Sequence, residues 1–326
     1  MNIIVTGAAG FIGSHLCELL LKDKNAHVIG IDNLSNGSLD NMKTFINNPN
    51  FYFLNTDLRF HPETKLEQVI SNVGKVHFVF HLAALGSVPR SIGDPKATFE
   101  NNSKVTHDLL CWAVKHQVRK FIYASSSSVY GNLNRPTKNE NDPTAPINPY
   151  GLSKLVGEQY CKVFEKTYGI NTVSFRFFNV FGPRQKWRDI YSGVIPVWIE
   201  NILEGRPIIL HNNGTQTRDF TYVGDVVEVL RRSLFMSTRD VYNVGCGVET
   251  KLVDFAEELF QSIGIRGSMN LQFEPREGDI LRSQADVTRL RNDLNYTPTR
   301  SRKQMIDTFV YYKKLLNAAP TSEISF

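Results

Sequence analysis

Short apolar runs alternate with helix-patterned stretches along the first half of the chain. The apolar runs are rich in β-branched and aromatic residues, as buried strands are, and they span residues 2–6, 27–31, 51–54, 75–84, 121–124 and 173–178. Between them, apolar residues at helical spacing predict helices that start near Phe11 and cover about 95–116 and 149–168. Strands that alternate with helices indicate an α/β fold built on a doubly wound parallel sheet, with helices on both faces.

The pattern loosens from about residue 179, where prolines and glycines separate shorter elements. A smaller α+β region is expected there. The run at 241–245 still has the pattern of a sheet strand, so the two regions should interleave. We therefore predict a first domain over residues 1–178, with a return segment near 219–245, and a substrate domain over 179–326.

Three glycines, Gly7, Gly10 and Gly13, follow the first strand and open the first helix. In such a turn the first glycine permits the sharp bend, the second lets the backbone approach a diphosphate, and the third lets the helix lie close to the sheet. The helix N-terminus adds free N–H groups for the anion. The sequence therefore predicts a Rossmann-like dinucleotide site, with Phe11 and Ile12 inside the turn.

Asp32 ends the second strand, about 20 residues after the turn, where a carboxylate can accept both ribose hydroxyls of the cofactor. An acid at this point would repel a 2′-phosphate, so it favours NAD over NADP. An aspartate that only caps a helix is the plainer alternative.

The composition narrows the class of protein. The chain has 326 residues and a formal net charge of +5 without long basic runs, so nucleic acid is not an expected partner. No apolar run approaches the roughly 20 residues that span a bilayer, and the first strand starts too early for a signal peptide. The 4 cysteines lack metal-site spacing and are expected to be reduced thiols of a cytoplasmic protein, so no metal is predicted. Most arginines follow residue 175, which fits an anionic substrate.

Tyr150 and Lys154 lie one turn apart on the predicted helix over 149–168. An ammonium beside a phenol favours the phenolate and should lower the tyrosine pKa. The serine run 125–128 follows a strand and precedes Tyr150, so one of its hydroxyls would reach the group that Tyr150 deprotonates. A surface tyrosine with a solvated lysine, and serines that only satisfy a strand end, are the plainer alternatives.

With these motifs in this order, the chain resembles the extended short-chain dehydrogenase/reductases, in the nucleotide-sugar epimerase/dehydratase family, from Asn2 to about Asp293. The resemblance implies a Rossmann-like NAD domain and the catalytic residues Ser126, Tyr150 and Lys154, of which Tyr150 and Lys154 also contact NAD. The other NAD contacts that it implies are Gly7, Gly10, Phe11, Ile12, Gly13, Asp32, Asn33, Asp57, Leu58, Leu82, Ala83, Ala84 and Asn102.

The same resemblance implies a UDP-sugar substrate. Asn179, Arg218 and Arg282 match segments that hold the substrate diphosphate, and Arg282 follows the matching stretch 276–279. The complete set of implied substrate contacts is Ser87, Val88, Arg90, Ser126, Ser127, Ser128, Asn179, Arg218, Arg282 and Ser283.

The residues after Ser126 divide the family by reaction. Dehydratases of the family carry Asp-Glu there, because eliminating water needs an acid and a base, whereas this chain has Ser127-Ser128. A decarboxylase needs a pocket for a sugar carboxylate, for which only Arg90 can be argued. Epimerisation or simple oxidation remains, and epimerisation needs only reversible hydride transfer and room for the keto sugar to turn over.

Two features bear on the sugar. The loop 85–95 resembles that of bacterial UDP-N-acetylglucosamine 4-epimerases, and Ser283 stands where a tyrosine would close the family's sugar pocket to an N-acetyl group. The hypothesis is therefore an NAD-dependent 4-epimerase that interconverts UDP-GlcNAc and UDP-GalNAc through a 4-keto intermediate. A UDP-glucose or UDP-glucuronate 4-epimerase stays open, as do a dehydratase or decarboxylase and a non-catalytic NAD sensor, although a sensor would usually lack the tyrosine–lysine pair.

The resemblance also implies a homodimer, because the family commonly pairs the helices near 97–116 and 150–168 between two subunits. Outward apolar candidates on these helices are Leu109, Trp112, Leu155 and Phe164. A role for these side chains in the core of one subunit is equally open from the sequence.

Overall fold

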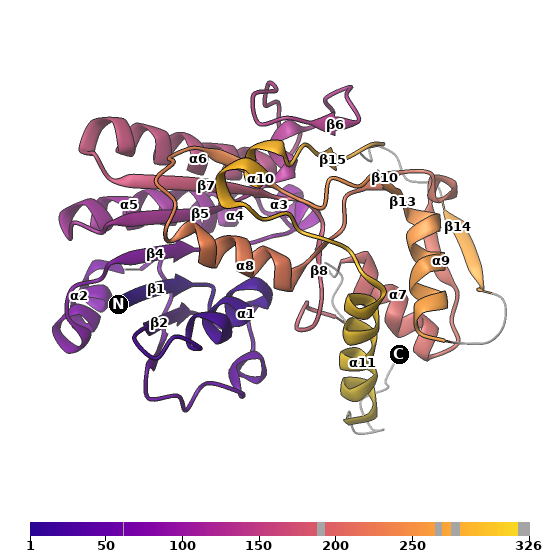
Figure 1. The fold of residues 1–326 in the computed structure, drawn as a ribbon, viewed down its shortest axis with the longest axis horizontal. Helices are drawn as coiled ribbons and strands as arrows, with labels where there is room; N and C mark the ends of the chain where they lie inside the picture. The colour runs from indigo at the N-terminus through magenta and orange to yellow at the C-terminus, as the bar shows by residue number, and fades with distance from the viewer. Residues whose placement is uncertain (61, 188–192, 265–268, 275–280, 319–326) are drawn as a thin grey trace.

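A computed structural model describes residues 1–60, 62–187, 193–264, 269–274 and 281–318 (Figure 1). The stretch 276–279, which the sequence resemblance placed before Arg282, lies outside these residues.

The centre of the fold is a parallel sheet of 7 strands in the order β12-β7-β5-β4-β1-β2-β3. The strands are β1 (Asn2–Thr6), β2 (His27–Asp32), β3 (Phe51–Asn55), β4 (Phe78–His81), β5 (Lys120–Ser126), β7 (Asn171–Phe177) and β12 (Val241–Val244). Every pairing between neighbours is parallel. The order reverses between β1 and β4, and in doubly wound sheets ligands bind beyond the carboxyl ends of the strands at this point. The predicted α/β fold is confirmed.

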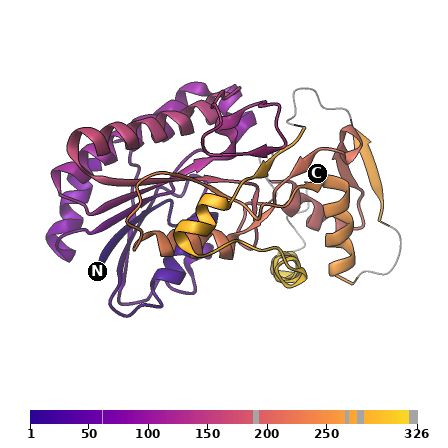
Figure 2. The ribbon, with the colours of Figure 1, turned by 45° about the horizontal axis from the view of Figure 1, so that its top comes forward.

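Helices cover both faces of the sheet (Figures 1 and 2). Alternate residues of β1 point to opposite faces, so Ile3 and Val5 pack in one apolar cluster and Ile4 packs in another. The first cluster joins helices α1 (Phe11–Leu20), α8 (Val223–Ser233) and α10 (Thr288–Leu294) to the sheet. The second joins α2 (Pro62–Val73), α5 (Val105–Lys115) and α6 (Pro149–Tyr168).

The helix predicted over about 95–116 consists of three consecutive pieces. These are α4 (Pro95–Thr98), the π-helical turn η2 (Phe99–Lys104) and α5. A π turn inserts an extra residue into a helix and occurs mostly at functional sites. Here it carries Asn102, whose side chain is buried. The short α3 (Val88–Gly93) precedes α4.

The second half of the chain adds a separate apolar cluster, built around Trp198, Phe255 and Tyr312. It is formed by α7 (Val194–Leu203), α9 (Leu252–Ser262), α11 (Arg302–Ala318) and the parallel pair β9 (Ile208–His211) and β14 (Leu271–Glu274). Figures 1 and 2 show these elements beside one end of the large sheet.

Short pairs and turns complete the described elements. The pairs are β6 (Thr137–Lys138) with β15 (Gln284–Ala285), β8 (Val180–Phe181) with β11 (Thr221–Tyr222), and β10 (Thr217–Arg218) with β13 (Thr250–Lys251). The 3-10 turns are η1 (Leu39–Met42), η3 (Ser127–Tyr130) and η4 (Asn212–Gly214). In the parts of the chain described above, no helix is long and apolar enough to cross a membrane.

Of the four apolar candidates for an outward dimer face, three take the alternative role in the core, and Leu155 is partly buried. Leu109, Trp112 and Phe164 are buried in the second apolar cluster, and Leu155 packs against Val129 and its neighbours. Helices α5 and α6 use these side chains to cover the sheet, because a helix on a sheet must bury its apolar stripe there first. Exposed apolar side chains in η2 and α6 include Phe99, Leu152 and Val163.

Candidate functional site

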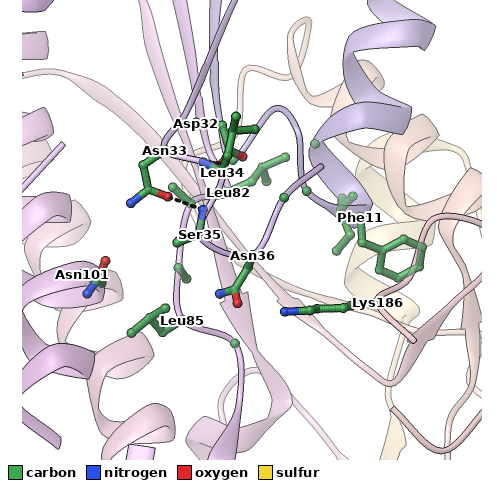
Figure 3. A pocket seen from close by; sticks show the side chains of 18 of the residues that line it. Phe11, Asp32, Asn33, Leu34, Ser35, Asn36, Leu82, Leu85, Asn101 and Lys186 are labelled. Atoms are coloured by element: carbon green, nitrogen blue, oxygen red, sulfur yellow. Dashed lines mark hydrogen bonds between the residues drawn. The ribbon is translucent and has the colours of Figure 1, made fainter. Parts of the chain in front are cut away.

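A cavity of about 780 Å³ opens at the carboxyl ends of the central strands, where the strand order reverses. It is lined by the glycine turn, the ends of β2, β3 and β4, helix α6 and the segment 184–187. Figure 3 shows side chains from several of these elements directed around one space. The predicted site residues among its lining are Gly7, Gly10, Phe11, Ile12, Gly13, Asp32, Asn33, Asp57, Leu58, Leu82, Ala83, Ala84, Ser87, Arg90, Tyr150 and Lys154.

The backbone of the glycine turn leaves no room for a side chain at Gly7 or Gly13. Gly7 has a φ of +73°, which L side chains rarely adopt. A Cβ on Gly13 would lie 2.0 Å from the carbonyl oxygen of Gly7. The first turn of α1 therefore sits directly against the end of β1, and its N-terminus faces the cavity as a dinucleotide diphosphate requires.

The carboxylate of Asp32 is held at the cavity edge by the backbone. Its Oδ2 accepts from the Ala9 N–H at 3.0 Å and its Oδ1 accepts from the Leu34 N–H at 2.8 Å. Burial raises the pKa of Asp32, and these backbone donors oppose the rise. The acid is thus fixed between the glycine turn and the next loop, which suits hydrogen bonds to ribose hydroxyls and excludes a second phosphate.

A second acid, Asp57, organises the end of β3. Arg59 donates to both carboxylate oxygens, and Asn33 Nδ2 donates to Oδ2 at 3.0 Å. The hydrogen bond from Arg59 lowers the pKa of Asp57 to about 2, although burial opposes it. Arg59 also lines the cavity, and the sequence reasoning did not single it out.

The wall formed by Leu82 and Ala83 is held by a buried chain of side chains. Thr6 Oγ1 accepts from both of their backbone N–H groups, at 3.2 and 3.1 Å, so its own hydrogen is donated to His81 Nδ1 at 2.8 Å. His81 Nε2 then donates to Thr106 Oγ1 at 2.9 Å. Burial lowers the pKa of His81 to about 3, so the ring is neutral and this single tautomer satisfies both contacts.

Asn102 lies behind this wall and not in the lining of the cavity. Its Oδ1 accepts from the Leu85 N–H at 2.8 Å, and its Nδ2 donates to Ser153 Oγ at 3.0 Å. The π turn thus ties the loop after β4 to helix α6, next to Lys154. Sequence reasoning placed Asn102 among the NAD contacts, whereas its contacts here position the residues that line the cavity.

Tyr150 and Lys154 lie on the inner face of α6 and both line the cavity. Lys154 Nζ donates to the carbonyl oxygen of Ala124, near the end of β5, at 2.8 Å and lies 6.0 Å from the centre of the Tyr150 ring. Ser126 ends β5, and its Oγ accepts from the Ser128 N–H at 3.1 Å. A hydrogen bond also joins Ser126 to Tyr150. The three predicted catalytic side chains therefore converge from β5 and α6.

The expectation that Lys154 lowers the pKa of Tyr150 is wrong in this structure. Burial raises the pKa of Tyr150, with only the hydrogen bond to Ser126 acting the other way. Burial likewise lowers the pKa of Lys154 to about 7. For both side chains, desolvation of the charged form shifts the pKa more than the other side chain does, because the two lack direct contact.

The depressed pKa of Lys154 predicts a pH-dependent stability of the NAD-free protein. Below about pH 7 the lysine is charged in both the folded and the unfolded chain, so its burial destabilises the fold fully. Between that pH and the ordinary value of 10.5, only the unfolded chain keeps the proton, so the penalty fades as pH rises. We expect Lys154→Met to raise the thermal midpoint at pH 6, by an increment that shrinks toward pH 10 in a melting series.

Lys166→Met is the matched control, since Lys166 is exposed on the same helix. Its melting difference from the wild type should not follow pH in this range. A Lys154→Met protein that melts below the wild type at pH 6 would contradict the assignment.

Of the predicted substrate residues, Ser87 and Arg90 line the cavity and the others do not. Val88, Ser126, Ser127 and Ser128 lie outside its lining, as do Asn179, Arg218, Arg282 and Ser283. Arg282 pairs with Glu249 and remains half exposed, and Ser283 is buried. Arg218 and Arg282 still come from adjacent segments, because the Thr217 N–H donates to the Leu281 carbonyl at 2.9 Å.

Asp219, which directly follows the predicted phosphate-binding Arg218, joins these segments. Its fully buried carboxylate accepts from the N–H groups of Cys246, Gly247 and Ala285. The Asp219 carboxylate thus joins the segment that follows Arg218 to β15, the strand that follows Ser283. An acid directly after a predicted phosphate-binding arginine was the sequence signal for it.

Arg90 lies on the cofactor side of the cavity. Its Nη1 donates to Asn36 Oδ1 at 2.9 Å, in the loop that follows Asp32, and Ser87 Oγ caps α3 by accepting from the Arg90 N–H. The guanidinium of Arg90 therefore lies near the dinucleotide turn. Arg218 and Arg282 are distant from Arg90 in sequence and do not line the cavity.

The residues present fit an NAD molecule. The lining of the cavity runs from Asp57 past Asp32 and the glycine turn to Tyr150 and Lys154. The volume of the cavity is within the range of cofactor sites. The close approach at Gly13 suits the diphosphate of the cofactor, and the fixed carboxylate of Asp32 suits the hydroxyls of its adenosine ribose. Within the described residues, no group of three or more His, Cys, Asp or Glu side chains is arranged to hold a metal.

Comparison with known proteins agrees with this geometry. Residues 3–245 match the family described as the NAD dependent epimerase/dehydratase family. A curated relative from Methanocaldococcus jannaschii, described as a putative UDP-glucose 4-epimerase, is 36% identical over 313 residues, covering 96% of this chain and 98% of the relative.

Two solved structures superpose over nearly the whole chain. A UDP-N-acetylglucosamine 4-epimerase from Methanobrevibacter ruminantium, in complex with UDP-N-acetylmuramic acid, has a TM-score of 0.89 and 32% identity over 96% of this chain and 98% of its own. A UDP-glucuronic acid 4-epimerase from Bacillus cereus, in complex with UDP-glucuronic acid and NAD, has a TM-score of 0.87 and 33% identity over 97% of this chain and 100% of its own. The cofactor of the chain is NAD, and the chain belongs to the NAD dependent epimerase/dehydratase family.

Proposed function

We propose that the protein is a nucleotide-sugar 4-epimerase that interconverts UDP-GlcNAc and UDP-GalNAc. The observation that carries the proposal is the meeting of Tyr150 and Lys154 with the glycine turn in one cavity, next to Ser126. A tyrosine held at the nicotinamide end of a dinucleotide site can remove a hydroxyl proton while the attached carbon is oxidised. Similar proteins carry the names of UDP-sugar 4-epimerases, which supports the reaction type.

The chain's own residues would divide the work. Tyr150 takes the proton from the carbon-4 hydroxyl of the sugar, and Ser126 shares that proton through its hydrogen bond to Tyr150. Lys154 Nζ donates to the Ala124 carbonyl and lies 6.0 Å from the centre of the Tyr150 ring, and it would contact the cofactor ribose. Bound NAD supplies a reversible hydride acceptor and a positive ring that favours the phenolate. Net redox change is zero, so no external oxidant is consumed.

The neighbours of Ser126 support epimerisation over dehydration. Ser127 and Ser128 form the turn η3 after β5, and Ser128 is engaged with Ser126 through both its N–H and its Oγ. Neither residue has an acidic group, so no acid and base pair stands beside the reacting carbon for the loss of water.

The choice of N-acetylated sugar rests on two sequence features, the loop 85–95 and the small Ser283. Asn179, Arg218 and Arg282 are proposed to anchor the substrate diphosphate, the two arginines from adjacent segments held together by the buried Asp219. UDP-glucose and UDP-glucuronate are the alternative substrates, since similar proteins carry those names.

The test is a substrate panel. Purified protein is incubated separately with UDP-GlcNAc, UDP-glucose and UDP-glucuronate, with and without added NAD, and the products are identified by NMR and mass. UDP-GlcNAc should give UDP-GalNAc of unchanged mass. Absence of conversion with NAD present would reject the proposal, conversion of only another sugar would reassign the substrate, and a loss of water or carbon dioxide would identify a different reaction.

The proposal includes the organisation of the protein. Residues 1–178, with the return segment near 219–245, would form the NAD-binding part, and 179–326 the nucleotide-sugar part. A cytoplasmic homodimer is part of it, with Phe99, Leu152 and Val163 as the apolar side chains that remain exposed near α4–α6. Light scattering of the purified protein measures the oligomeric state.

A further inference from the structure

One wall of the NAD cavity comes from the second half of the chain. Arg184, Gln185, Lys186 and Trp187 line the cavity on the side of α11, and Gly10, Phe11 and Ile12 line it from the glycine turn. Figure 3 shows Lys186 extending into this space toward Asn36, with Phe11 beside it. A cofactor that leaves on this side must therefore pass between the glycine turn and the segment 183–187.

Two contacts fasten this segment to the helix that opens the glycine turn. Arg184 Nη2 pairs with Glu18 Oε2 at 2.5 Å, and His15 Nε2 lies 2.9 Å from the Pro183 carbonyl oxygen. His15 and Glu18 lie on the same face of α1, three residues apart. We name these four residues, His15, Glu18, Pro183 and Arg184, the α1 latch.

The His15 contact is a neutral hydrogen bond with a defined direction. Burial lowers the pKa of His15 to about 4, so its ring is uncharged at neutral pH. Because a carbonyl oxygen can only accept, Nε2 carries the hydrogen and donates it to Pro183.

The ion pair between Arg184 and Glu18 is partly shielded from water. The Arg184 side chain is 12% exposed, and its Nη1 is buried with no hydrogen-bond partner among the residues that the structure describes. Glu18 is thus the carboxylate that offsets this buried charge, and its second oxygen accepts from Thr44 at 3.0 Å. Partly buried charged contacts of this kind are worth more than exposed ion pairs.

The backbone of the segment is held in an unfavourable conformation. Arg184 has a φ of 66°, in the left-handed region that side chains other than glycine rarely adopt. Such a conformation persists where surrounding contacts fix it. Tyr312 of α11 donates to the Gln185 carbonyl at 2.6 Å, so a second helix also holds the segment.

We propose that the α1 latch holds the segment 183–187 closed against the glycine turn and thereby sets the rate at which NAD leaves. Opening this wall would break the Glu18–Arg184 pair and the His15–Pro183 bond together. The inference rests on NAD as the cofactor and not on the identity of the sugar. An enzyme that must return a hydride to the same substrate gains from slow release, because early loss of the reduced cofactor would strand the oxidised sugar.

The test is the exchange rate of bound NAD in the whole protein without any sugar. Protein saturated with NAD is mixed with an excess of isotopically labelled NAD, and the bound label is followed over time after rapid desalting. Glu18→Gln, which keeps the shape of the side chain and removes its charge, should speed exchange by about 10-fold. Melting curves of the same samples verify that the fold is intact.

Glu67→Gln is the matched control, because Glu67 also forms an ion pair, with Lys115 at 3.2 Å, on a helix outside the cavity lining. It should exchange at the wild-type rate. The double variant Glu18→Arg with Arg184→Glu restores an opposite-charge pair and should slow exchange again.

Wild-type exchange in Glu18→Gln, an equal acceleration in Glu67→Gln, or no recovery in the double variant would each overturn the latch. The substrate panel does not enter this measurement, so the failure of the latch and the failure of the proposed epimerase activity are separate results.

Discussion

Replacing Tyr150 by phenylalanine is expected to lower the turnover number of the proposed epimerase by about 100-fold to 10,000-fold, the range that positioned acid–base groups contribute. The substitution removes one oxygen atom from a partly buried side chain that lines the NAD cavity and is hydrogen-bonded to Ser126. Tyr123 also lies beside Lys154, with 5.2 Å from Lys154 Nζ to its ring centre, but it is buried and does not line the cavity, so it cannot replace Tyr150. The measurement is conversion of UDP-GlcNAc under saturating substrate, with the NAD content of each preparation determined after acid release.

Tyr168→Phe is the matched control, because Tyr168 ends the same helix and is 58% exposed. Its turnover and NAD content should equal those of the wild type. The Tyr150→Phe protein should keep its NAD, since the glycine turn and Asp32 are untouched. Full activity in Tyr150→Phe would exclude the assigned mechanism, and the absence of any activity in the wild type, with NAD bound, would favour a sensor.

The cofactor half of the site was predictable because local sequence dictates it. The glycine turn and Leu82–Ala84 directly follow strands, Asp32 ends one, and in a parallel sheet such strand ends meet at one edge. The spacing of Tyr150 and Lys154 puts both on one helical face, and that face borders the cavity. Local pattern and tertiary arrangement agree at these positions, so the predicted residues line one cavity.

The residues that hold this half in place were not predictable in the same way. Thr6, His81 and Thr106 form their hydrogen-bonded chain across β1, β4 and α5, and nothing in their spacing along the sequence indicates it. The wrong expectation for the pKa of Tyr150 has a related cause. Spacing on a helix gives proximity, whereas desolvation depends on all the elements that pack around the pair.

The outward face of α5 and α6 shows the same limit. Leu109, Trp112 and Phe164 have the spacing of an apolar stripe, and such a stripe can cover a sheet or meet a partner equally well. Here the stripe packs on the sheet, because the subunit must bury the face of its sheet in order to fold. Sequence periodicity identifies the stripe but not the surface that it meets.

The second large effect is expected at a buried ion pair next to Ser126, the proposed catalytic serine. Glu158 follows Lys154 by one further turn on α6, and its carboxylate accepts from Arg176 Nε at 2.9 Å and Nη2 at 2.7 Å. Ser125 Oγ donates to the same carboxylate at 2.5 Å. Glu158 is 1% exposed and Arg176 is 4% exposed. The pair thus fixes the end of β5, directly before Ser126, between α6 and β7.

Glu158→Ala should lower the free energy of unfolding by about 3–5 kcal/mol, because it leaves the Arg176 guanidinium buried without a counter-charge. Denaturant unfolding monitored by circular dichroism measures the loss. Asp108→Ala is a suitable control, since Asp108 pairs with Lys104 on a half-exposed part of α5, and exposed pairs contribute only about 0–1 kcal/mol.

The double variant Glu158→Leu with Arg176→Met separates the cost of an unpaired charge from the value of the pair. Apolar replacement of both partners of a buried ion pair is often neutral or stabilising, so the double variant should be more stable than Glu158→Ala. Its activity should still fall, because Ser125 loses its acceptor and the end of β5 that carries Ser126 is no longer fixed. Equal stability of Glu158→Ala and the wild type would contradict the buried charge, and full activity in the double variant would show that Ser126 is positioned without it.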